Sequence, residues 1–322
     1  MSRHLRVLST GGTIASTGEG DGATPKVTGQ ELIEAVPTIK QHAEITVEQV
    51  VQRPSFEMDF EAIIAVAKRA KAAILDGADG VVVTHGTDTM GESAYLLDRV
   101  VDVEKPIVFT GSQRRPDEVS PDGPANLVTA IKTAANDQFG TAGGVYIAFD
   151  ETIHAAETVS KVHTSKLGTF QSPDSGPVAS ETREGFRFHR EPGGQQAIFE
   201  PIVPDADVRI IPSAAGVSRA PIDEAVDAGV DGIVLDGTGL GNATGDLGNA
   251  AVDAINAGVP VVVTSRCLGG ETRAVYGGNG GGETLHQHGV RFAGALSAQK
   301  ARIELALALS QLDAPLTHFA SN

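Results

Sequence analysis

The sequence predicts an α/β protein built on doubly wound parallel sheets. Short runs of β-branched and other apolar residues alternate with longer segments whose apolar residues recur at helical spacing. Two of the apolar runs are followed by turns rich in glycine and hydroxyl residues, at the strand ends where open parallel sheets bind ligands. With 322 residues, the chain is long for one core and fits two α/β domains.

The first half of the chain alternates strand and helix patterns, as a doubly wound sheet requires. Five apolar runs predict strands at residues 5–8, 45–50, 80–83, 107–109 and 145–149. Between them, Ala-rich or amphipathic segments predict helices at residues 60–75, 93–101 and 125–135. Because strands and helices alternate, we expect these strands to be parallel.

A second, shorter series follows a break in this rhythm. Residues 181–204 are polar, contain Gly193-Gly194 and end in prolines, which is typical of a connection with at most a short hairpin. Further strands are predicted at 208–211, 232–235 and 259–263, and helices at 222–228, 250–257 and 299–309. We therefore expect a larger N-terminal doubly wound, flavodoxin-like domain, a linker and a smaller C-terminal α/β domain, over residues 1–183, 184–207 and 208–322.

The charge balance limits the possible partners. The chain has 41 acidic and 25 basic residues, a formal net charge of -16. Nucleic acid and anionic membranes rely on neutralisation by Lys and Arg, so we expect neither as a partner. Only 9 of the basic residues are lysines, against 16 arginines. This scarcity favours a halophilic protein, kept soluble in strong salt by its carboxylates, over an ordinary acidic one.

The remaining bulk features predict a cytoplasmic location and no metal. No apolar stretch approaches the roughly 18–20 residues of a membrane span, and the first strand follows residue 4 without a signal-peptide hydrophobic region. A single cysteine, Cys267, excludes an intramolecular disulfide and a Cys-rich metal site. His286 and His288 form a possible metal pair, but no third ligand cluster accompanies them.

The turn after the first strand offers a candidate nucleophile. Thr13 lies between Gly12 and Ile14 at the mouth of this strand. The glycine-rich stretch that follows, residues 16–24, suggests a mobile lid. Alternatively, the threonines of this turn cap the next helix.

The turn after the third strand pairs a hydroxyl with a carboxylate. Thr87 can exchange a proton with a substrate, while the adjacent Asp88 can bind a positively charged group. The two residues could equally form a helix N-cap. His85 is interpreted as a buried structural residue rather than a catalytic base.

A threonine hydroxyl is a poor nucleophile at its own pKa and needs a base. Lysine can serve where burial or cationic neighbours depress its pKa. Lys161, in the hydroxyl-rich stretch TVSKVHT at 158–164, is the candidate, with an ordinary solvated lysine as the alternative.

In combination, these segments resemble the bacterial/archaeal-type L-asparaginase family, the asparaginase/glutaminase amidohydrolases. The resemblance covers nearly the whole chain in the right order. It is carried by residues 10–15 (TGGTIA), 80–90 (GVVVTHGTDTM), 111–127 (GSQR through SPDGPANL) and 299–302 (QKAR).

The resemblance implies a role for each matched residue. Thr13 matches the nucleophile, which attacks a side-chain amide, releases ammonia and forms an acyl-enzyme. Thr87, Lys161 and Asp88 match the group that relays protons, and Asp88 also holds the substrate α-ammonium. Ser55 matches the serine that binds the α-carboxylate. Backbone N–H groups near the two threonines form the oxyanion hole.

The chain departs from the family pattern at the lid. Family members place a tyrosine there, hydrogen-bonded to the nucleophile. The three tyrosines of this chain, Tyr95, Tyr146 and Tyr276, all lie outside residues 16–27. Thr24 is a candidate to fill part of the position that the tyrosine occupies in the family.

The resemblance also implies an oligomer. In the family, the C-terminal domain lends residues to the site of a neighbouring subunit, and Asn242 and Glu283 are the candidates here. We therefore expect a homodimer or homotetramer with sites at subunit interfaces.

The predicted activity is hydrolysis of L-asparagine to L-aspartate and ammonia, with no cofactor. A glutaminase-asparaginase of broader specificity is the nearest alternative, because the two substrates differ by one methylene. The amidase subunit of an archaeal tRNA-dependent amidotransferase is less favoured, since it carries an extra domain before the first threonine motif, which begins here at residue 10. A non-catalytic amino-acid sensor is the third alternative.

Overall fold

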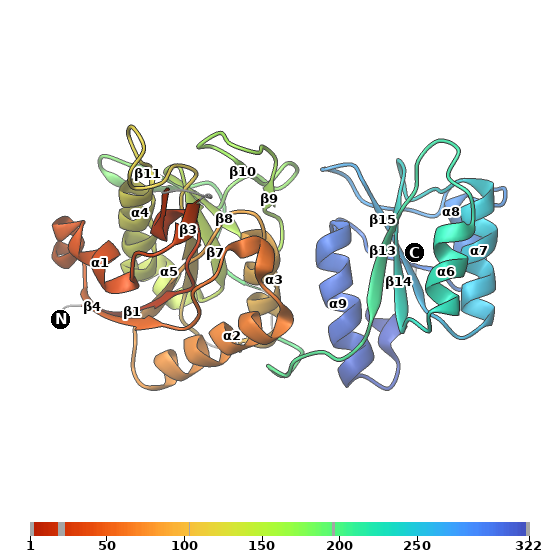
Figure 1. The fold of residues 1–322 in the computed structure, drawn as a ribbon, viewed down its shortest axis with the longest axis horizontal. Coiled ribbons are helices and arrows are strands. Elements are labelled where there is room, and N and C mark those ends of the chain that lie inside the picture. The colour runs from red at the N-terminus through yellow and green to blue at the C-terminus, as the bar shows by residue number, and fades with distance from the viewer. Residues whose placement is uncertain (1–2, 19–22, 103, 195–196, 320–322) are drawn as a thin grey trace. The chain divides into compact units, whose positions relative to one another are not determined.

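The computed structural model describes residues 3–18, 23–102, 104–194 and 197–319, with backbone only at 23–25 (Figure 1). The chain forms two compact units, Met1–Val203 and Pro204–Asn322. Each unit is a sheet with helices on both faces, so the predicted fold class, a doubly wound α/β domain followed by a smaller α/β domain, is confirmed.

The first unit contains an eight-stranded sheet in the order β12-β11-β8-β7-β6-β5-β1-β4. Five of its strands pair in parallel: β1 (His4–Ser9), β4 (Glu44–Gln49), β5 (Gly80–Thr84), β6 (Ile107–Thr110) and β7 (Val145–Phe149). Numbered along the chain, their spatial order is 2-1-3-4-5, which is the flavodoxin-like order.

All five predicted strands of this half are present. Three antiparallel strands extend the sheet beyond β7: β8 (Thr152–Ala155), β11 (Ala179–Thr182) and β12 (Gly185–Phe188). The sequence did not predict β8, and it allowed for β12 only as part of a short hairpin within residues 181–204.

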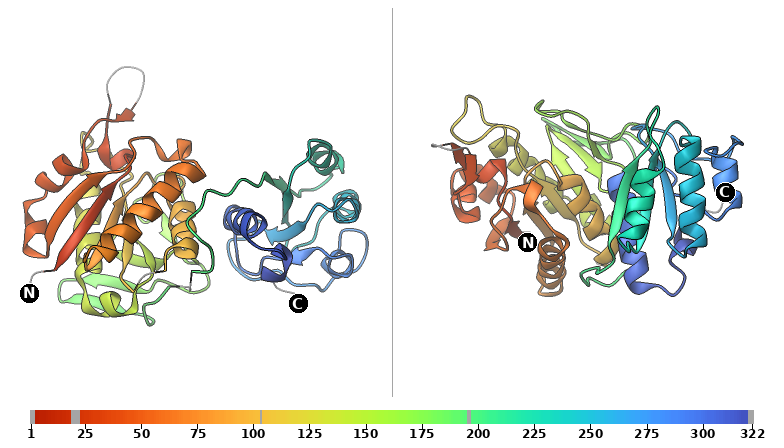
Figure 2. Two further views of the ribbon diagram at one scale, coloured as in Figure 1. Left: turned by 90° about the horizontal axis from the view of Figure 1, so that it is seen from below. Right: turned by 45° about the vertical axis from the view of Figure 1, so that its right-hand side comes forward.

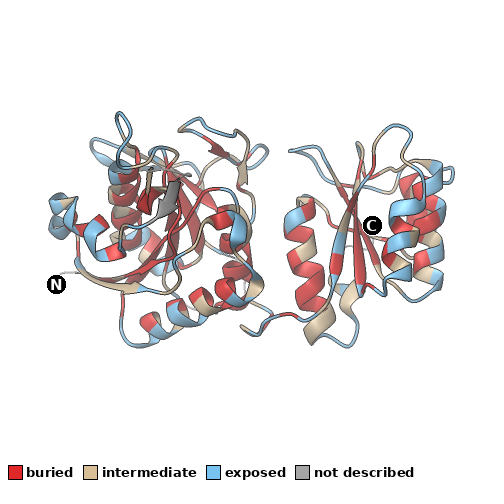
Figure 3. Cartoon of the chain, in the orientation of Figure 1, coloured by how far each residue is buried: buried red, intermediate tan, exposed pale blue. Residues whose placement is uncertain are grey.

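Helices cover both faces of this sheet (Figures 1 and 2). On one face, α1 (Gly29–Glu34), α4 (Gly123–Ala135) and α5 (Asp137–Ala142) contribute to one hydrophobic core with β1, β5, β6 and β7. On the other, α2 (Phe60–Leu75) packs against β1, β5 and α3 (Met90–Val100). Because both faces are covered, every residue of β5, β6 and β7 is buried (Figure 3).

Short elements surround the carboxyl ends of the strands. One-turn 3₁₀ helices follow β1 and β4, at Thr13–Ala15 and Ser55–Glu57, whereas a longer one at Pro37–Gln41 leads into the amino end of β4. Two small hairpins pair β2 (Ser16–Gly18) with β3 (Ala23–Pro25) and β9 (Ser160–Lys161) with β10 (Phe170–Gln171). The first hairpin occupies the predicted lid, whose residues 19–22 lie outside the described chain.

The segment 184–207, expected as a linker, instead contributes a strand to the first sheet. Its strand β12 pairs with β11, and the first compact unit extends to Val203. The physical reason is aromatic packing: the rings of Phe186 and Phe188 lie 5.8 and 5.2 Å from that of Phe139. Two aromatic residues that alternate along a short, otherwise polar strand form too brief a pattern to predict more than a possible short hairpin.

The second unit holds a parallel sheet in the order β13-β14-β15-β16, over Val208–Pro212, Gly232–Gly237, Val261–Ser265 and Arg291–Phe292. One face packs against α6 (Ala220–Asp227), α7 (Gly245–Asn256) and α8 (Gly282–Gln287), and α9 (Ala298–Gln311) contacts β13, β14 and β15. A final 3₁₀ turn spans Pro315–His318 and packs on α9. Within the described residues, no helix is both long and apolar enough to cross a membrane.

Candidate active site

The candidate site lies where the strand order of the first sheet reverses. The chain moves from β1 outward to β4 and then returns to β5 on the other side of β1. The loops after β1 and β5 therefore diverge from adjacent strand ends, which is where doubly wound sheets bind ligands. Thr10, at the end of β1, donates from its backbone N–H and its hydroxyl to the Thr84 carbonyl, at 3.0 and 2.9 Å.

Two glycines allow these loops to touch. Gly12 has a φ of 84°, in the left-handed region, and a Cβ added there would lie 2.3 Å from the Gly86 nitrogen. The backbones of Gly12 and Gly86 are thus in direct contact. The residues that follow them, Thr13 and Thr87, consequently belong to adjoining loops.

Thr13 begins a 3₁₀ turn but does not cap it. The N-cap of this turn is Gly12, and no side chain makes a capping hydrogen bond. The Gly12 carbonyl accepts from the Ala15 N–H at 3.0 Å and from the Ser16 hydroxyl at 2.8 Å, which fixes the turn. Ile14 and Ala15 are buried, while Thr13 is half-buried. The helix-cap alternative for Thr13 therefore finds no support in its geometry.

Lys161 meets both residues of the second turn. Its ammonium donates to the Thr87 hydroxyl at 2.9 Å and forms an ion pair with Asp88 Oδ1 at 2.6 Å. The N-cap of α3 is Thr89, without a side-chain capping bond, so neither Thr87 nor Asp88 caps this helix. Since the Thr87 oxygen accepts from Lys161, its own proton can point elsewhere. Lys161, Thr87 and Asp88 thus form one hydrogen-bonded trio of an amine, a hydroxyl and a carboxylate.

The 3₁₀ turn that starts at Ser55 joins the same cluster. The Ser55 hydroxyl accepts from the Asp88 N–H at 3.2 Å, and its carbonyl accepts from the Thr89 hydroxyl at 2.7 Å. A Cβ on Gly86 would lie 2.5 Å from Ser55 Oγ. Ser55, which is 5% exposed, thus contacts the turn that holds Thr87 and Asp88. Thr89 was not identified from the sequence.

His85 is a structural residue with a fixed tautomer. Its Nδ1 lies 2.7 Å from the Gly86 carbonyl, which can only accept, so Nδ1 carries the proton. Its Nε2 then accepts from the Ser93 hydroxyl, at 3.0 Å. Complete burial lowers the pKa of His85 to about 4, because the cationic form is excluded from the interior. Neutral and held at both nitrogens, His85 makes no hydrogen bond to either threonine.

Two further predicted site residues lie in the second unit, close to one another. The Asn242 side-chain oxygen accepts from the Gly282 N–H at 3.0 Å, and Glu283 follows directly. The Glu283 carboxylate accepts from Gln287 Nε2 at 2.8 Å. Both side chains are half-buried within their own unit.

The three tyrosines lie on elements other than the predicted lid. Tyr95 and Tyr146 are buried in the first unit, and Tyr276 is exposed in the second. The side chain of Thr24 lies outside the described part of the chain. Among the described residues, no group of three or more His, Cys, Asp or Glu side chains could hold a metal ion.

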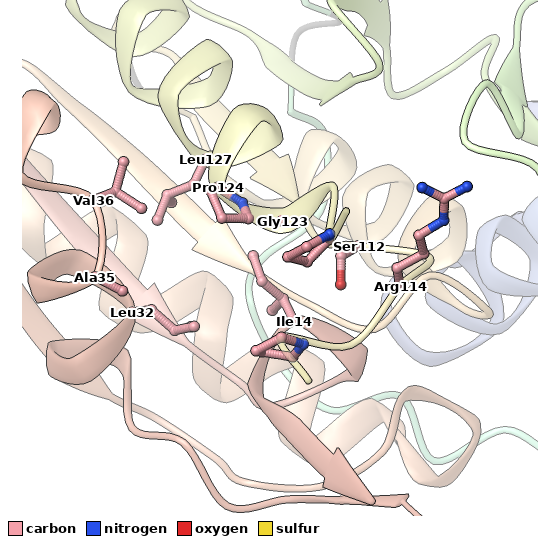
Figure 4. Close-up of a pocket in the computed structure, with 11 residues that line it drawn as sticks. Ile14, Leu32, Ala35, Val36, Ser112, Arg114, Gly123, Pro124 and Leu127 are labelled. Atoms are coloured by element: carbon pink, nitrogen blue, oxygen red, sulfur yellow. The ribbon is translucent and has the colours of Figure 1, made fainter. Parts of the chain in front are cut away.

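A cavity of about 190 Å³ lies on the α4 side of the Thr13 turn (Figure 4). Ile14 separates its apolar end, at Leu32 and Val36, from an end formed by Ser112 and Arg114. The buried Ser112 hydroxyl has no hydrogen-bond partner among the described residues. Thr87, Asp88 and Lys161 do not line this cavity, so it is separate from the hydrogen-bonded trio.

Comparison with known proteins identifies the family of the chain. Residues 4–193 match the family model described as asparaginase, N-terminal, and residues 207–317 match the glutaminase/asparaginase C-terminal domain. The chain is 35% identical to L-asparaginase 2 of Escherichia coli (strain K12) over 323 residues, which cover 97% of this chain and 90% of that protein.

Two other relatives extend the comparison. One component of the glutamyl-tRNA(Gln) amidotransferase from Methanothermobacter thermautotrophicus is 33% identical over 97% of this chain and 73% of its own length. The crystal structure of a probable cytoplasmic L-asparaginase from Campylobacter jejuni superposes with a TM-score of 0.88 at 31% identity, covering 99% of this chain and 98% of that one. The chain belongs to the asparaginase family and is an amidohydrolase.

Proposed function

We propose that the chain hydrolyses L-asparagine to L-aspartate and ammonia, with Thr13 as nucleophile. The observation that carries the proposal is the trio of Lys161, Thr87 and Asp88, which lies at the strand end adjoining the Thr13 turn. A nucleophilic hydroxyl needs a nearby group that accepts its proton. Lys161 supplies such a route, because it can pass a proton to the Asp88 carboxylate and take one from the Thr87 hydroxyl.

The reaction takes place in two halves. The Thr13 oxygen attacks the side-chain amide carbon and loses its proton towards the trio, giving a tetrahedral intermediate. The C–N bond then breaks, the nitrogen takes up a proton and ammonia leaves, so that an ester to Thr13 remains. Water attacks this ester with the same proton route, which releases aspartate and restores the hydroxyl. Backbone N–H groups of the two turns stabilise the oxyanion in each half.

Charged contacts at the other end of the substrate hold it in place. Asp88 binds the α-ammonium, and Ser55 donates a hydrogen bond to the α-carboxylate. The hydrogen bond from the Asp88 N–H to Ser55 Oγ supports this pairing, because the two residues are neighbours and the Ser55 oxygen acts there as acceptor, which leaves its own proton to donate. Such charge-assisted bonds orient a small substrate for attack.

Ammonia release from asparagine tests this assignment. Thr13→Ala and Thr87→Val should each abolish release while the far-ultraviolet circular dichroism stays that of the wild type. Thr141→Ala is the matched control, because Thr141 is exposed and its hydroxyl bonds only within α5. Retained release in either site variant would contradict the assigned role.

The preference for asparagine over glutamine is part of the proposal. One methylene accounts for only about 1–3 kcal/mol of discrimination in a pocket. A kcat/KM for asparagine more than about tenfold that for glutamine would support this preference, because tenfold is the lower end of what one methylene provides. Comparable values for the two amides would instead indicate a glutaminase-asparaginase of broader specificity.

We further propose a homodimer or homotetramer in which Asn242 and Glu283 from one copy complete the site of another. Their proximity within the second unit supports a shared role. Sedimentation together with Asn242→Ala tests this, since the variant should keep its oligomeric mass but raise KM. A monomer with full activity would contradict it.

A cytoplasmic location and a salt-adapted surface complete the proposal. The location is supported by the similarity to the Campylobacter jejuni protein, and subcellular fractionation tests it. The salt-adapted surface is supported by the net charge of -16.

Two outcomes would favour the alternative functions. If the isolated chain releases no ammonia from either amide, yet binds aspartate, the sensor alternative is favoured. Activity that needs a partner protein would favour an amidotransferase component.

A further inference from the structure

Two buried polar side chains at the start of α4, Asp122 and Asn126, connect separate loops around the site. They are 9% and 2% exposed. The Asn126 amide nitrogen donates to the Gly111 carbonyl and to Asp122 Oδ2, both at 3.0 Å. Its amide oxygen accepts from the Asp150 N–H at 2.9 Å. The buried Asn126 amide therefore donates to one loop and accepts from another. Buried networks in which every polar group is hydrogen-bonded make the surrounding structure rigid.

One arm of this network reaches the loop that carries Thr87. A Cβ on Gly111 would lie 2.2 Å from the His85 carbonyl oxygen, so Gly111 is in contact with backbone two residues before Thr87. Asp122 holds the residues that follow Gly111. Its carboxylate accepts from the N–H of Gln113 at 3.0 Å and from that of Arg114 at 2.8 Å.

The other arm reaches the hairpin that carries Lys161. Asp150 and Glu151 have φ values of 49° and 58° and form the two-residue turn between β7 and β8. This left-handed backbone is unfavourable for residues with side chains, and the bond from the Asp150 N–H to Asn126 helps hold it. Asp150 Oδ2 lies 2.9 Å from the place of a Cβ on Gly168, within the loop that joins β9 to β10.

We propose that Asn126 is a positioning residue for the hydrolysis, because it fixes the spacing between Thr87 and Lys161. The inference rests on the proposed function, in which these two groups pass a proton. Asn126 contacts neither of them and acts through Gly111 on one side and Asp150 on the other. A displacement of about 1 Å in a catalytic contact is enough to slow a reaction on the order of 100-fold.

Kinetics of two variants from the same helix test the proposal. Asn126→Leu removes the hydrogen bonds to Gly111 and to Asp150 while nearly keeping the size of the side chain. Thr133→Val is the matched control, since Thr133 is fully buried and its hydroxyl donates only to the Thr129 carbonyl, inside α4. Both are assayed at a temperature where circular dichroism shows them folded. Asn126→Leu should lower kcat roughly 10- to 100-fold with KM within about threefold, and Thr133→Val should change neither beyond about threefold.

Two kinetic results would overturn the proposal: equal losses of kcat in the two variants, or a kcat in Asn126→Leu within about threefold of the wild type. A second readout does not depend on turnover. Acetic anhydride labelling followed by mass spectrometry measures the reactivity of Lys161 relative to the exposed Lys166 of the same hairpin. The ratio should rise severalfold in Asn126→Leu and stay constant in Thr133→Val.

This labelling distinguishes a failure of the proposed function from a failure of the inference about Asn126. Wild-type protein that releases no ammonia contradicts the proposed function, while the ratio still decides whether Asn126 positions Lys161. An unchanged ratio in Asn126→Leu overturns the inference, whatever the activity of the wild type.

Discussion

The Lys161 ammonium donates to the Thr87 hydroxyl over 2.9 Å, although the two residues are 74 positions apart in the chain. Lys161 also forms its ion pair with Asp88. Thr87 and Asp88 are adjacent in sequence, so a single lysine engages the hydroxyl and the carboxylate of one turn. This contact joins the end of a central strand to a hairpin beyond β8.

Removing this lysine should cost most of the activity. Lys161→Met keeps the length of the side chain but removes the charge and the donors, and kcat should fall by about 10²–10⁴-fold, the range typical of acid–base groups. Lys166→Met, in the exposed part of the same hairpin, should leave kcat unchanged. Steady-state ammonia release measures both. Equal activities in the two variants would show that Lys161 is not part of the proton route.

Adding one methyl group between the two threonine turns should disrupt both. Gly12→Ala places a Cβ 2.3 Å from the Gly86 nitrogen at a φ of 84°. We expect a loss of roughly 2–5 kcal/mol in the free energy of unfolding, with loss of activity because the turns are pushed apart. Gly140→Ala is the control: its Cβ meets open space within α5. It should raise the stability by up to about 1 kcal/mol. Urea unfolding measures both.

The buried histidines should make the fold sensitive to mild acid. Burial lowers the pKa of His85 and of His154 to about 4 in the folded chain, from an ordinary value of 6.5. Between pH 6.5 and 4 the unfolded chain therefore binds more protons than the folded chain. The contribution of these histidines to the free energy of unfolding is fully present above pH 6.5 and falls as the pH drops through this window. The loss is on the order of 3 kcal/mol per histidine at the lower end.

Urea unfolding at pH 7.5, 6.5, 6.0 and 5.5 measures this slope above the range in which most carboxylates titrate. His85→Asn, which keeps a side-chain N–H for the Gly86 carbonyl, should flatten the slope by about half, because one of two equivalent histidines is removed. A wild-type stability that is constant across these values would contradict the prediction.

Salt should stabilise the chain. Its net charge of -16 implies repulsion among surface carboxylates, and the screening length shrinks from about 10 Å at 0.1 M to about 3 Å at 1 M ionic strength. The urea midpoint should therefore rise between 0.1 and 2 M KCl, with most of the increase below about 1 M. A midpoint that falls, or does not move, would leave the halophilic interpretation without support.

The elements predicted well from sequence are those with a long or strongly apolar pattern. The helix expected at residues 60–75 is α2, and all five apolar runs of the first half are parallel strands. The helix expected at 93–101 begins earlier, at Met90, because its first turn is hidden in the Thr-rich motif. The strand β8 was missed, and β11 and β12 were expected at most as a short hairpin, because each has only four residues and partly polar faces.

The candidate site was predictable only in part. Glycines and hydroxyls after apolar runs pointed to Thr13 and Thr87, but the choice of Lys161 relied on its hydroxyl-rich surroundings and on the family resemblance. Asn126 lies in the segment 111–127 that carries the family resemblance, but nothing in that segment pointed to its long-range contacts. Asn126 looks like an ordinary polar helix residue until its bonds to Gly111 and Asp150 are seen.

The strand order also sets the sequence of events by which the site can form. β5 pairs with β1 although β4 and its flanking helices lie between the two strands in the chain. The hairpin that holds Lys161 comes later still in the chain. Contacts this distant along the chain form late, because the entropy of closing long loops must be met before they are made. Recovery of catalysis during refolding therefore reports completion of the N-terminal sheet, and helical structure can return well before it.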